Sequence, residues 1–348
     1  MTSKITISPK FNLMDIFRMP ISKRNNNYHL YKSGRYSLYY ALGNIKKIFK
    51  EIDTIYVPNL ICPQVLIPIK ENGIAIKYYN IDRNLNFDKK ILLDEVDDKC
   101  IVLVINYFGF PSDWEFFNNL KKNKKCLLIS DNCHAIFTEF KKKSLNEYGD
   151  ISFNSLRKII PTLSGSQLFY NNNNLNIMEK NINPRLPNKD ELKLIFRSLK
   201  PDFIKKNYGT IEQVGEFDYS KNYSKFFNIK KNTNIDIFSN NIFEKYLSNE
   251  ITIKKKRIEN FNYWSNFLPS SDFHFINIDK MSSEICPYVF PCIPKSTEIM
   301  NKWLSWSKMK NIVVINWGNK HEFLDKDLKR ILLFPVAHNF DIAKSLVR

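Results

Sequence analysis

Glycine is scarce in this chain of 348 residues, which contains only nine. The glycine-rich loops that cradle nucleotide phosphates, G-x-x-x-x-G-K-S/T and G-x-G-x-x-G, are absent. Cysteine is also sparse: the six residues form no Cys-x-x-Cys pair and no zinc-type spacing with the five histidines. These absences argue against a phosphate-binding glycine loop, a disulfide-rich scaffold and a structural zinc site, and we expect no metal.

Long apolar runs are missing too. No stretch approaches the ~20 consecutive apolar residues that a membrane-spanning helix requires. The segment Met1–Asn12 lacks the uninterrupted apolar core of a signal peptide. Hydrophobic residues nevertheless make up 43% of the chain, enough for a sizeable core. We therefore expect a cytoplasmic protein without membrane insertion, built as one large and one smaller domain.

Acidic residues are few for the number of basic ones. The chain has 35 Asp and Glu against 53 Lys and Arg, a formal net charge of +18. Such an excess suits a nucleic acid, an acidic membrane surface or an anionic small substrate. The lysines are scattered over both halves, with local tracts at Lys121–Lys125 and Lys254–Arg257. A nucleic-acid binder would gather them on one stripe, so a basic polyanion-binding protein is kept only as an alternative.

The first half of the chain alternates helix and strand patterns. An apolar stripe from Leu38 to Ile52, with steps of three and four residues, predicts an amphipathic helix. A more polar helix is expected over Asp113–Lys122. Short β-rich runs predict strands at Thr54–Val57, Ile74–Ile81, Cys100–Phe108 and Cys126–Ser130. This alternation predicts an α/β domain with a mainly parallel sheet flanked by helices.

The second half has a different pattern. One predicted helix carries four apolar residues on a single face: Ile258, Phe261, Trp264 and Leu268. Another helix, around Thr297–Met309, lies between two β-like runs, Ile285–Cys292 and Asn311–Ile315. These elements predict a smaller α+β domain. We place the large domain at residues 1–230 and the small C-terminal domain at residues 231–348.

Ser33, Gly34 and Arg35 come immediately before the main apolar stripe. A helix N-terminus offers free backbone N–H groups and the positive end of the helix dipole, which together favour a phosphate. Gly34 would allow the backbone to approach closely, and Arg35 could form two hydrogen bonds with phosphate oxygens. The alternative is structural: Ser33 caps the helix and Gly34 forms a turn.

Asp131 and His134 belong to the segment Asp131-Asn132-Cys133-His134-Ala135, directly after a predicted buried strand. Ligands of open α/β sheets bind beyond the carboxyl ends of the strands. A carboxylate at such a place can pair with a cationic ring nitrogen or with a metal. The structural alternative is a helix cap at Asp131 and a packing role for His134.

A third cluster brings together the hydroxyls of Ser152 and Ser155 and the amine of Lys158. A lysine near hydroxyls and Asp131 can act as a nucleophile toward an aldehyde, although a lysine is more often solvated in so basic a chain. Together the three clusters supply a phosphate seat, an acid for a ring nitrogen and a lysine for an aldehyde. Pyridoxal 5'-phosphate (PLP) requires these groups.

These motifs resemble those of the DegT and StrS family of PLP-dependent sugar aminotransferases. Ser33-Gly34-Arg35 resembles its Ser-Gly-Thr helix start, and Asn106-Tyr107-Phe108-Gly109 its His/Asn-x-x-Gly strand end. Asp131-Asn132-Cys133-His134-Ala135 is similar to its Asp-x-x-(His/Gln)-(Ala/Gly) box, and Gly149-Asp150-Ile151-Ser152-Phe153 leads to Lys158. The resemblance covers about Ser33–Leu168 and is fainter beyond it.

The resemblance implies the type I aminotransferase fold and a homodimer with active sites at the subunit interface. It implies that Lys158 bonds to the cofactor aldehyde and then moves the proton, while Asp131 stabilises the pyridine nitrogen and His134 lies on the side of the ring oxygen. The implied cofactor-binding residues are Ser33, Gly34, Arg35, Asp131, His134, Ser152, Ser155 and Lys158, with either Ser152 or Ser155 serving the phosphate. The implied reaction transfers an amino group, commonly from glutamate, to a nucleotide-linked keto sugar, as in surface-polysaccharide synthesis.

Three departures from the family pattern keep alternatives open. Cys62 stands where the family often has an aromatic that stacks on the cofactor, Lys158 lies one residue farther from Ser152-Phe153 than usual, and Ser164-Gly165-Ser166 replaces a Gly-Gly pair. The alternatives within this fold are a sugar dehydratase or an inactive PLP-binding homologue. Family members that dehydrate typically lack the lysine, so Lys158 favours transamination. Trp317 and His338 are candidate substrate contacts or simple packing residues.

Overall fold

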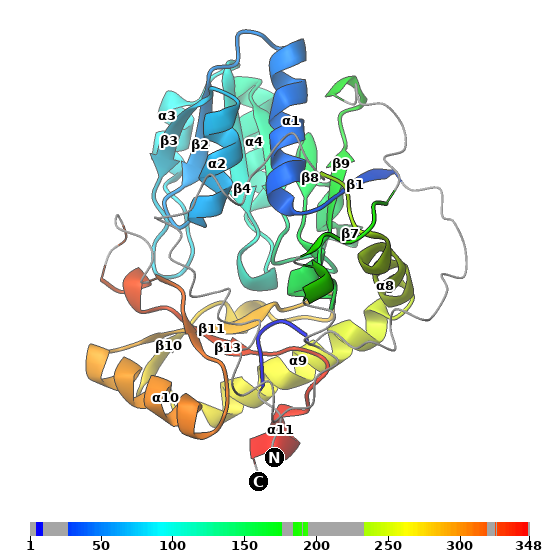
Figure 1. Ribbon diagram of the computed structural model, residues 1–348. Coiled ribbons are helices and arrows are strands. Elements are labelled where there is room, and N and C mark those ends of the chain that lie inside the picture. The colour runs from blue at the N-terminus through cyan, green and yellow to red at the C-terminus, as the bar shows by residue number, and fades with distance from the viewer. Residues whose placement is uncertain are drawn as a thin grey trace.

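The computed structural model describes residues 5–9, 27–175, 184–189, 191–193, 233–318, 324 and 326–346. The predicted boundary between residues 230 and 231 lies outside this part of the chain. The described helices and strands form two main sheets with helices packed against them, which confirms the predicted α/β class (Figure 1). None of the described helices is both long and apolar enough to cross a membrane.

Seven strands form the large sheet, in the order β1-β9-β8-β5-β4-β2-β3. The strands from β8 to β3 are parallel. At one edge, β9 pairs antiparallel with β8, and β1 pairs antiparallel with β9. Their bounds are β1 Tyr28–Tyr31, β2 Thr54–Pro58, β3 Ala75–Tyr79, β4 Cys100–Ile105, β5 Leu127–Asp131, β8 Ile151–Phe153 and β9 Ser166–Tyr170. Every residue of β4 is buried, as expected for a parallel strand covered on both faces.

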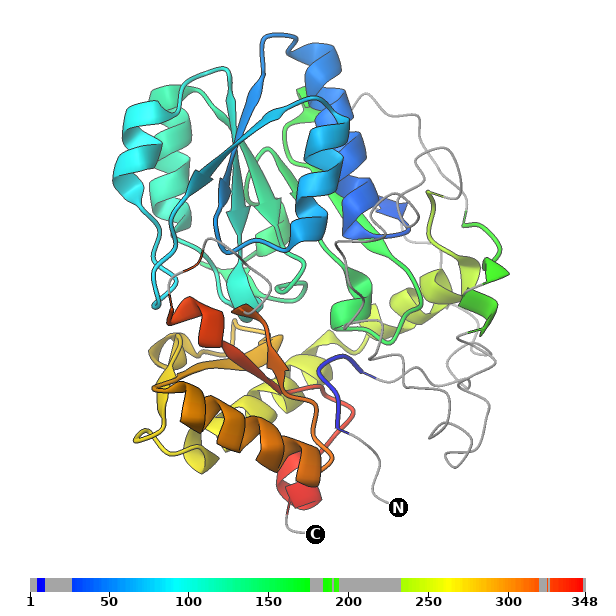
Figure 2. The same ribbon diagram turned by 60° about the vertical axis from the view of Figure 1, so that its left-hand side comes forward.

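Helices cover both faces of this sheet, α1 and α2 on one and α3 and α4 on the other (Figure 2). They are α1 Gly34–Ile48, α2 Pro63–Glu71, α3 Lys89–Glu95 and α4 Trp114–Lys124. The predicted stripe buries Leu38, Leu42 and Ile45 of α1. The helix ends at Ile48, before the end of the stripe, and Ile52 enters the core from the following loop.

The predicted strand Cys100–Phe108 is too long, because the chain leaves the sheet after Ile105. A 3-10 turn follows, in which Phe108 has a left-handed φ of 59°. The side chain of Asn106 holds this turn: its Oδ1 accepts the N–H of Ser112 at 2.8 Å and the indole N–H of Trp114 at 3.1 Å. The other strands predicted in this half lie close to β2, β3 and β5.

A smaller antiparallel sheet, in the order β10-β11-β13-β12, lies below the large sheet in Figure 1. Its strands are β10 Phe273–Phe275, β11 Val289–Pro294, β12 Ile315–Asn316 and β13 Leu332–Pro335. The helices around it are α8 Ile237–Leu247, α9 Glu250–Phe267, α10 Thr297–Met309 and α11 Ile342–Leu346. The two predicted helices are confirmed as α9 and α10.

Both strands predicted for the small sheet begin too early. The run from Ile285 enters the sheet only at Val289, and the run from Asn311 only at Ile315. At β11 the reason is a competing partner: the N–H of Tyr288 donates to the carbonyl of Phe108 at 2.7 Å and so joins the turn after β4.

The segments beyond β4 and β5 meet the segment before β11. Thr138 donates its hydroxyl to the carbonyl of Gly109 at 2.7 Å and accepts the N–H of Cys286 at 2.9 Å. The N–H of Glu139 donates to the carbonyl of Glu284 at 2.9 Å. The approach to the small sheet is therefore held against the carboxyl ends of the central strands.

Candidate active site

Asp131 is the last residue of β5, between β4 and β8 in the middle of the large sheet. It is only 4% exposed, and its Oδ1 accepts the N–H of Cys133 at 2.9 Å. Burial raises the pKa of this carboxyl, and the charge of Lys158 and the hydrogen bonds from Cys133 offset the rise only in part. The structure thus places a buried carboxyl where a ligand of this kind of sheet would lie.

Lys158 ends a short 3-10 turn, Leu156–Lys158, that follows β8. A backbone hydrogen bond from the N–H of Leu156 to the carbonyl of Gly165, at 3.0 Å, holds the start of this turn. Gly165 has a φ of +127°, and a Cβ at this position would lie 2.7 Å from Cδ1 of Leu156. The single glycine of Ser164-Gly165-Ser166 therefore stands where the backbone around Lys158 requires one.

Aromatic rings enclose His134. Its ring stacks on Tyr288 with centroids 4.7 Å apart and lies parallel to Phe108 at 5.8 Å, while Trp317 meets it edge-on at 5.9 Å. Burial, together with the charge of Lys158, holds the pKa of His134 well below its usual value, so the ring is neutral. Nδ1 accepts the N–H of Phe108 at 3.3 Å, which leaves the proton on Nε2. His134 is therefore a neutral hydrogen-bond donor at Nε2.

The ammonium of Lys158 lies among acidic and aromatic groups. Its Nζ atom is 5.7 Å from the centre of the Tyr288 ring. Burial alone would lower the pKa of Lys158, but Cys133, Tyr288, Asp131 and Cys62 together raise it. Cys62 also raises the pKa of the Cys133 thiol, after the larger effects of burial and Asp131. The residue that departs from the family pattern, Cys62, therefore lies near the candidate lysine.

The N-terminus of α1 lies against the ends of β5 and β8. A Cβ at Gly34 would lie 3.2 Å from Sγ of Cys133 and 3.3 Å from the carbonyl oxygen of Asn154, so glycine permits this approach. Ser33 occupies the N-cap position, but its side chain makes no capping hydrogen bond. The Ser33 hydroxyl is buried and has no hydrogen-bond partner in the described part of the chain, which disfavours the simple capping role. Arg35 follows and is half-buried.

The two candidate serines, Ser152 and Ser155, differ in the hydrogen bonds that their hydroxyls make. Ser152 lies within β8, and its hydroxyl donates to the carbonyl of Asn146 at 2.6 Å. The next residue, Phe153, contacts the Gly34 position at the start of α1, so strand alternation turns Ser152 to the opposite face. Ser155 is buried beside the Lys158 turn, and its hydroxyl makes no capping hydrogen bond.

Tyr288 is the main residue that the sequence did not reveal. Cys286-Pro287-Tyr288 continues into an apolar run and predicts only a strand. Trp317, one of the two candidate substrate contacts near the C-terminus, does lie beside His134. The other candidate, His338, packs instead against Tyr246, with ring centroids 5.8 Å apart.

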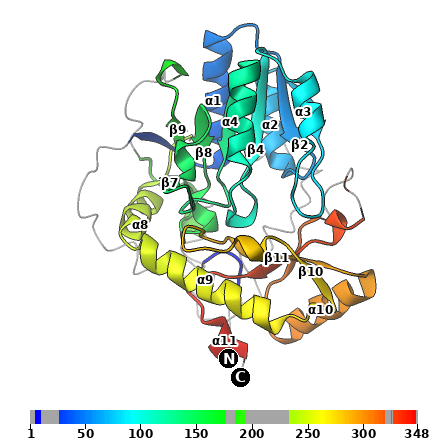
Figure 3. The same ribbon diagram turned by 180° about the vertical axis from the view of Figure 1, so that it is seen from behind.

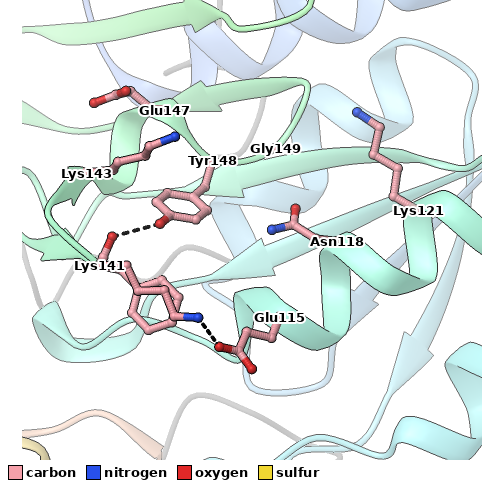
Figure 4. Close-up of a pocket in the computed structure, with 9 residues that line it drawn as sticks. Glu115, Asn118, Lys121, Lys141, Lys143, Glu147, Tyr148 and Gly149 are labelled. Carbon is pink, nitrogen blue, oxygen red and sulfur yellow. Dashed lines mark hydrogen bonds and ion pairs between the residues drawn. The ribbon is translucent and has the colours of Figure 1, made fainter.

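A surface cavity of about 430 Å³ lies between α4 and the hairpin of β6 (Glu139–Phe140) and β7 (Lys143–Ser144), and none of the candidate residues lines it (Figure 4). Its lysines are partly neutralised: Lys121 pairs with buried Asp150 at 2.6 Å, and Lys141 pairs with Glu115. Lys254 of the second basic tract lies 3.6 Å from Glu139. Such local pairing does not favour the polyanion-binding alternative.

No known family profile matches the sequence. Among curated proteins, the GDP-4-keto-6-deoxy-D-mannose 3-dehydratase of Escherichia coli O55:H7 is 28% identical over 106 residues. The match covers 30% of this chain and 27% of that relative, so the chain aligns with about a quarter of the relative's length.

Solved structures match over almost the whole chain. Helicobacter pylori PseC, an aminotransferase involved in the biosynthesis of pseudoaminic acid, has a TM-score of 0.70 at 14% identity, covering 99% of this chain and 97% of that one. Escherichia coli GDP-4-keto-6-deoxy-D-mannose-3-dehydratase with bound hydrated PLP has a TM-score of 0.67 at 16% identity, covering 100% and 98%. The predicted type I fold is confirmed: the chain has the fold that PLP-dependent sugar aminotransferases of the DegT and StrS type share with this GDP-sugar dehydratase.

Proposed function

We propose that the chain is a PLP-dependent aminotransferase that transfers an amino group from an amino acid such as glutamate to a nucleotide-linked keto sugar. The observation that carries the proposal is the convergence of three groups at the strand ends: the buried carboxyl of Asp131, the amine of Lys158 and the unpartnered hydroxyl of Ser33. The shared fold supports the proposal, because PseC is an aminotransferase and the Escherichia coli dehydratase was solved with PLP.

The residues at the start of α1 fit the phosphate of PLP. The buried Ser33 hydroxyl lacks a partner among the described residues, and a phosphate oxygen would accept its hydrogen bond. Gly34 allows close approach of the helix N-terminus, and Arg35 adds a positive charge. Ser155 is the better second hydroxyl, because that of Ser152 already donates to Asn146.

Asp131 and His134 fit the cofactor ring. PLP, when bound, supplies an electron sink that stabilises negative charge on the carbon bearing the substrate's amine. The Asp131 carboxylate would accept a hydrogen bond from the protonated ring nitrogen and keep it charged in a poorly solvated place. His134, protonated at Nε2, would donate a hydrogen bond to the ring oxygen.

Lys158 fits the role of covalent anchor and proton carrier. Its Nζ atom would bond to the cofactor aldehyde and, once released by the incoming amine, take a proton from one carbon and deliver it to another. The Tyr288 ring beside Nζ restricts where the amine can move. Cys62 offers a thiol instead of an aromatic surface near this lysine.

A dehydratase is the second candidate, because the matched curated relative is a 3-dehydratase. Lys158 supports transamination instead, since the family's dehydratases typically lack this lysine. The direct test is to incubate the purified protein with PLP, L-glutamate and a panel of nucleotide keto sugars. We expect 2-oxoglutarate to form in equal amount with a nitrogen-containing nucleotide sugar. A product that has lost a hydroxyl group would favour dehydration, and a protein that never binds PLP would contradict both candidates.

The same proposal extends to the oligomeric state, the cellular location and the pathway of the enzyme. We propose a cytoplasmic homodimer with shared active sites that serves surface-polysaccharide synthesis. Light scattering of the purified protein tests the dimer, and a mass corresponding to one chain would count against it.

A further inference from the structure

Arg257 is an internal residue of α9 and is fully buried, with 0% of its surface exposed. Its Nη1 atom donates to the backbone carbonyls of Pro287 at 3.1 Å and Tyr288 at 3.2 Å. Its Nε and Nη2 atoms are buried and have no hydrogen-bond partner among the residues that the structure describes. Arginine is almost never buried unless its charge is paired, so this side chain needs an explanation.

The two unpartnered nitrogens lie on one edge of the guanidinium group. The N–H bonds on that edge point in parallel, which matches the two oxygens of a carboxylate. Because Nη1 is already bonded to the backbone, the orientation of the guanidinium is fixed. The free edge therefore forms a preorganised fork.

His338 lies next to this fork. Asn260, three residues after Arg257 on α9, donates to the carbonyls of Val336 at 3.5 Å and Ala337 at 3.1 Å. Residues three apart share a helix face, so these bonds hold the His338 segment beside Arg257. Both ring nitrogens of His338 are buried, and no described residue is a hydrogen-bond partner of either. Burial and the charge of Arg257 lower the pKa of His338 to about 3, so the ring is neutral and offers one N–H donor.

No described neighbour balances the charge of Arg257. The groups that act on its pKa, after burial, are the thiol of Cys286 and the phenol of Tyr288. Burial raises the pKa of Cys286 to about 11, so this thiol is neutral at physiological pH. No ion pair joins Arg257 to a carboxylate in the described part of the chain. Within the described part of the chain, the cluster thus combines one positive charge and at least three donors with no anion.

We propose that Arg257 and His338 form a binding site for a carboxylate, supplied either by a small free carboxylate ion or by an amino acid. The site lies where α9 passes alongside the approach to β11 (Figure 3). It is linked to the candidate active site, because Arg257 holds the carbonyl of Tyr288, whose ring lies over Lys158. The site stands on its own residues and does not depend on PLP binding.

Calorimetric titration of the cofactor-free, full-length protein with sodium formate, in a chloride-free buffer, tests the site. We expect saturable binding of one formate per chain. His338→Phe should weaken it about tenfold or more, because it removes a donor to a buried charge. Arg257→Lys should weaken it further, because lysine lacks the fork. Arg83→Lys, at an exposed arginine 4.0 Å from Asp327, is the matched control and should bind as the unaltered protein does.

A crystal structure of the unaltered protein with formate makes the test independent of whether the variants fold. Density for formate bridging Nε and Nη2 of Arg257 supports the site, and water alone at both nitrogens overturns it. Absence of saturable formate binding, or unchanged binding by His338→Phe, overturns it as well. Titration with L-glutamate then identifies the source of the carboxylate. If L-glutamate competes with formate and the competition depends on His338, the carboxylate belongs to an amino acid. If it does not compete, the site binds a small free carboxylate ion.

Discussion

The ring of Tyr288 covers the ammonium of Lys158, with Nζ 5.7 Å from the ring centre. The same ring stacks on His134 at a centroid distance of 4.7 Å. Lys158 belongs to the turn after β8, whereas Tyr288 belongs to the segment before β11. The approach to the small sheet therefore supplies one wall of a site whose charged groups come from the large sheet.

Replacing Tyr288 tests this wall. Tyr288→Leu should lower the free energy of unfolding by about 1–2 kcal/mol, because it removes both the stack on His134 and the cation–π contact with Lys158. Tyr288→Phe keeps the ring and should stay within about 0.5 kcal/mol of the unaltered protein. Urea unfolding of the cofactor-free protein measures both. Equal losses for the two variants would show that the hydroxyl, and not the ring, provides the stabilisation.

Lys158→Ala should remove the visible absorbance of covalently held PLP and slow 2-oxoglutarate formation at least ~10²–10⁴-fold, the range expected for loss of an acid–base group. The fold should persist, because backbone bonds and Gly165 shape the turn. Arg157→Ala is the matched control, since Arg157 precedes Lys158 in the same turn and is exposed. A Lys158→Ala protein with near-normal turnover would refute the assignment.

Asp131→Asn should raise the stability of the protein and lower its activity. Burial raises the pKa of Asp131 in the folded state, so the folded protein binds more protons than the unfolded chain just above pH 4, and stability falls as pH rises through the folded pKa. Asparagine carries no charge, so its stability does not fall as pH rises through that range. Its side-chain oxygen can still accept the hydrogen bond from the Cys133 N–H. We expect a higher melting temperature than the unaltered protein at pH 7, a smaller difference at pH 4, and at least ~10²-fold lower activity.

Glu191→Gln is the comparison with Asp131→Asn, because the pKa of Glu191 is shifted in the opposite direction. Burial tends to raise the pKa of Glu191, but Arg185, 2.7 Å away, outweighs it and the pKa is lowered. Its stabilisation is present at pH 7 and is lost as pH falls through the folded pKa. Glu191→Gln should therefore lower the melting temperature at pH 7 and have a smaller effect in acid. The same pH trend in both variants would contradict the burial argument for Asp131.

Local patterns were sufficient to predict the framework of the site. The apolar stripe located α1, and the position of Ser33-Gly34-Arg35 before it predicted a helix N-terminus there. The apolar run over Cys100–Phe108 predicted a strand, and β4 forms there with every residue buried. Asp131 was expected just after a strand and is in fact its last residue, which leaves it at the same edge of the sheet.

Contacts between distant segments could not be predicted in this way. Tyr288 reaches Lys158 because its N–H bonds to Phe108, whose left-handed backbone conformation no apolar pattern encodes. The hydrogen bond from Ser152 to Asn146 decides which serine hydroxyl is available, and it joins a strand to a preceding turn. The missing partner of Ser33 is likewise a property of packing.

Ser33→Ala distinguishes a phosphate ligand from a helix cap. An N-cap serine that bonds the helix contributes ~0.5–2 kcal/mol, but Ser33 makes no such bond. Removing its buried, unpartnered hydroxyl should leave the cofactor-free protein as stable as before, or more stable by up to about 1 kcal/mol. PLP affinity should fall about tenfold, because one hydrogen bond to a charged phosphate is lost.

Ser296→Ala is the matched control for this experiment. Ser296 caps α10, and its side chain accepts the N–H of Ile299 at 3.2 Å. Its replacement should lower the free energy of unfolding by about 1 kcal/mol and leave PLP affinity unchanged. The two serines occupy the same position in their helices, so only the bond that each hydroxyl makes distinguishes them. If Ser33→Ala behaved like Ser296→Ala, in stability and in PLP affinity alike, Ser33 would be a cap and the phosphate seat would have to be placed elsewhere.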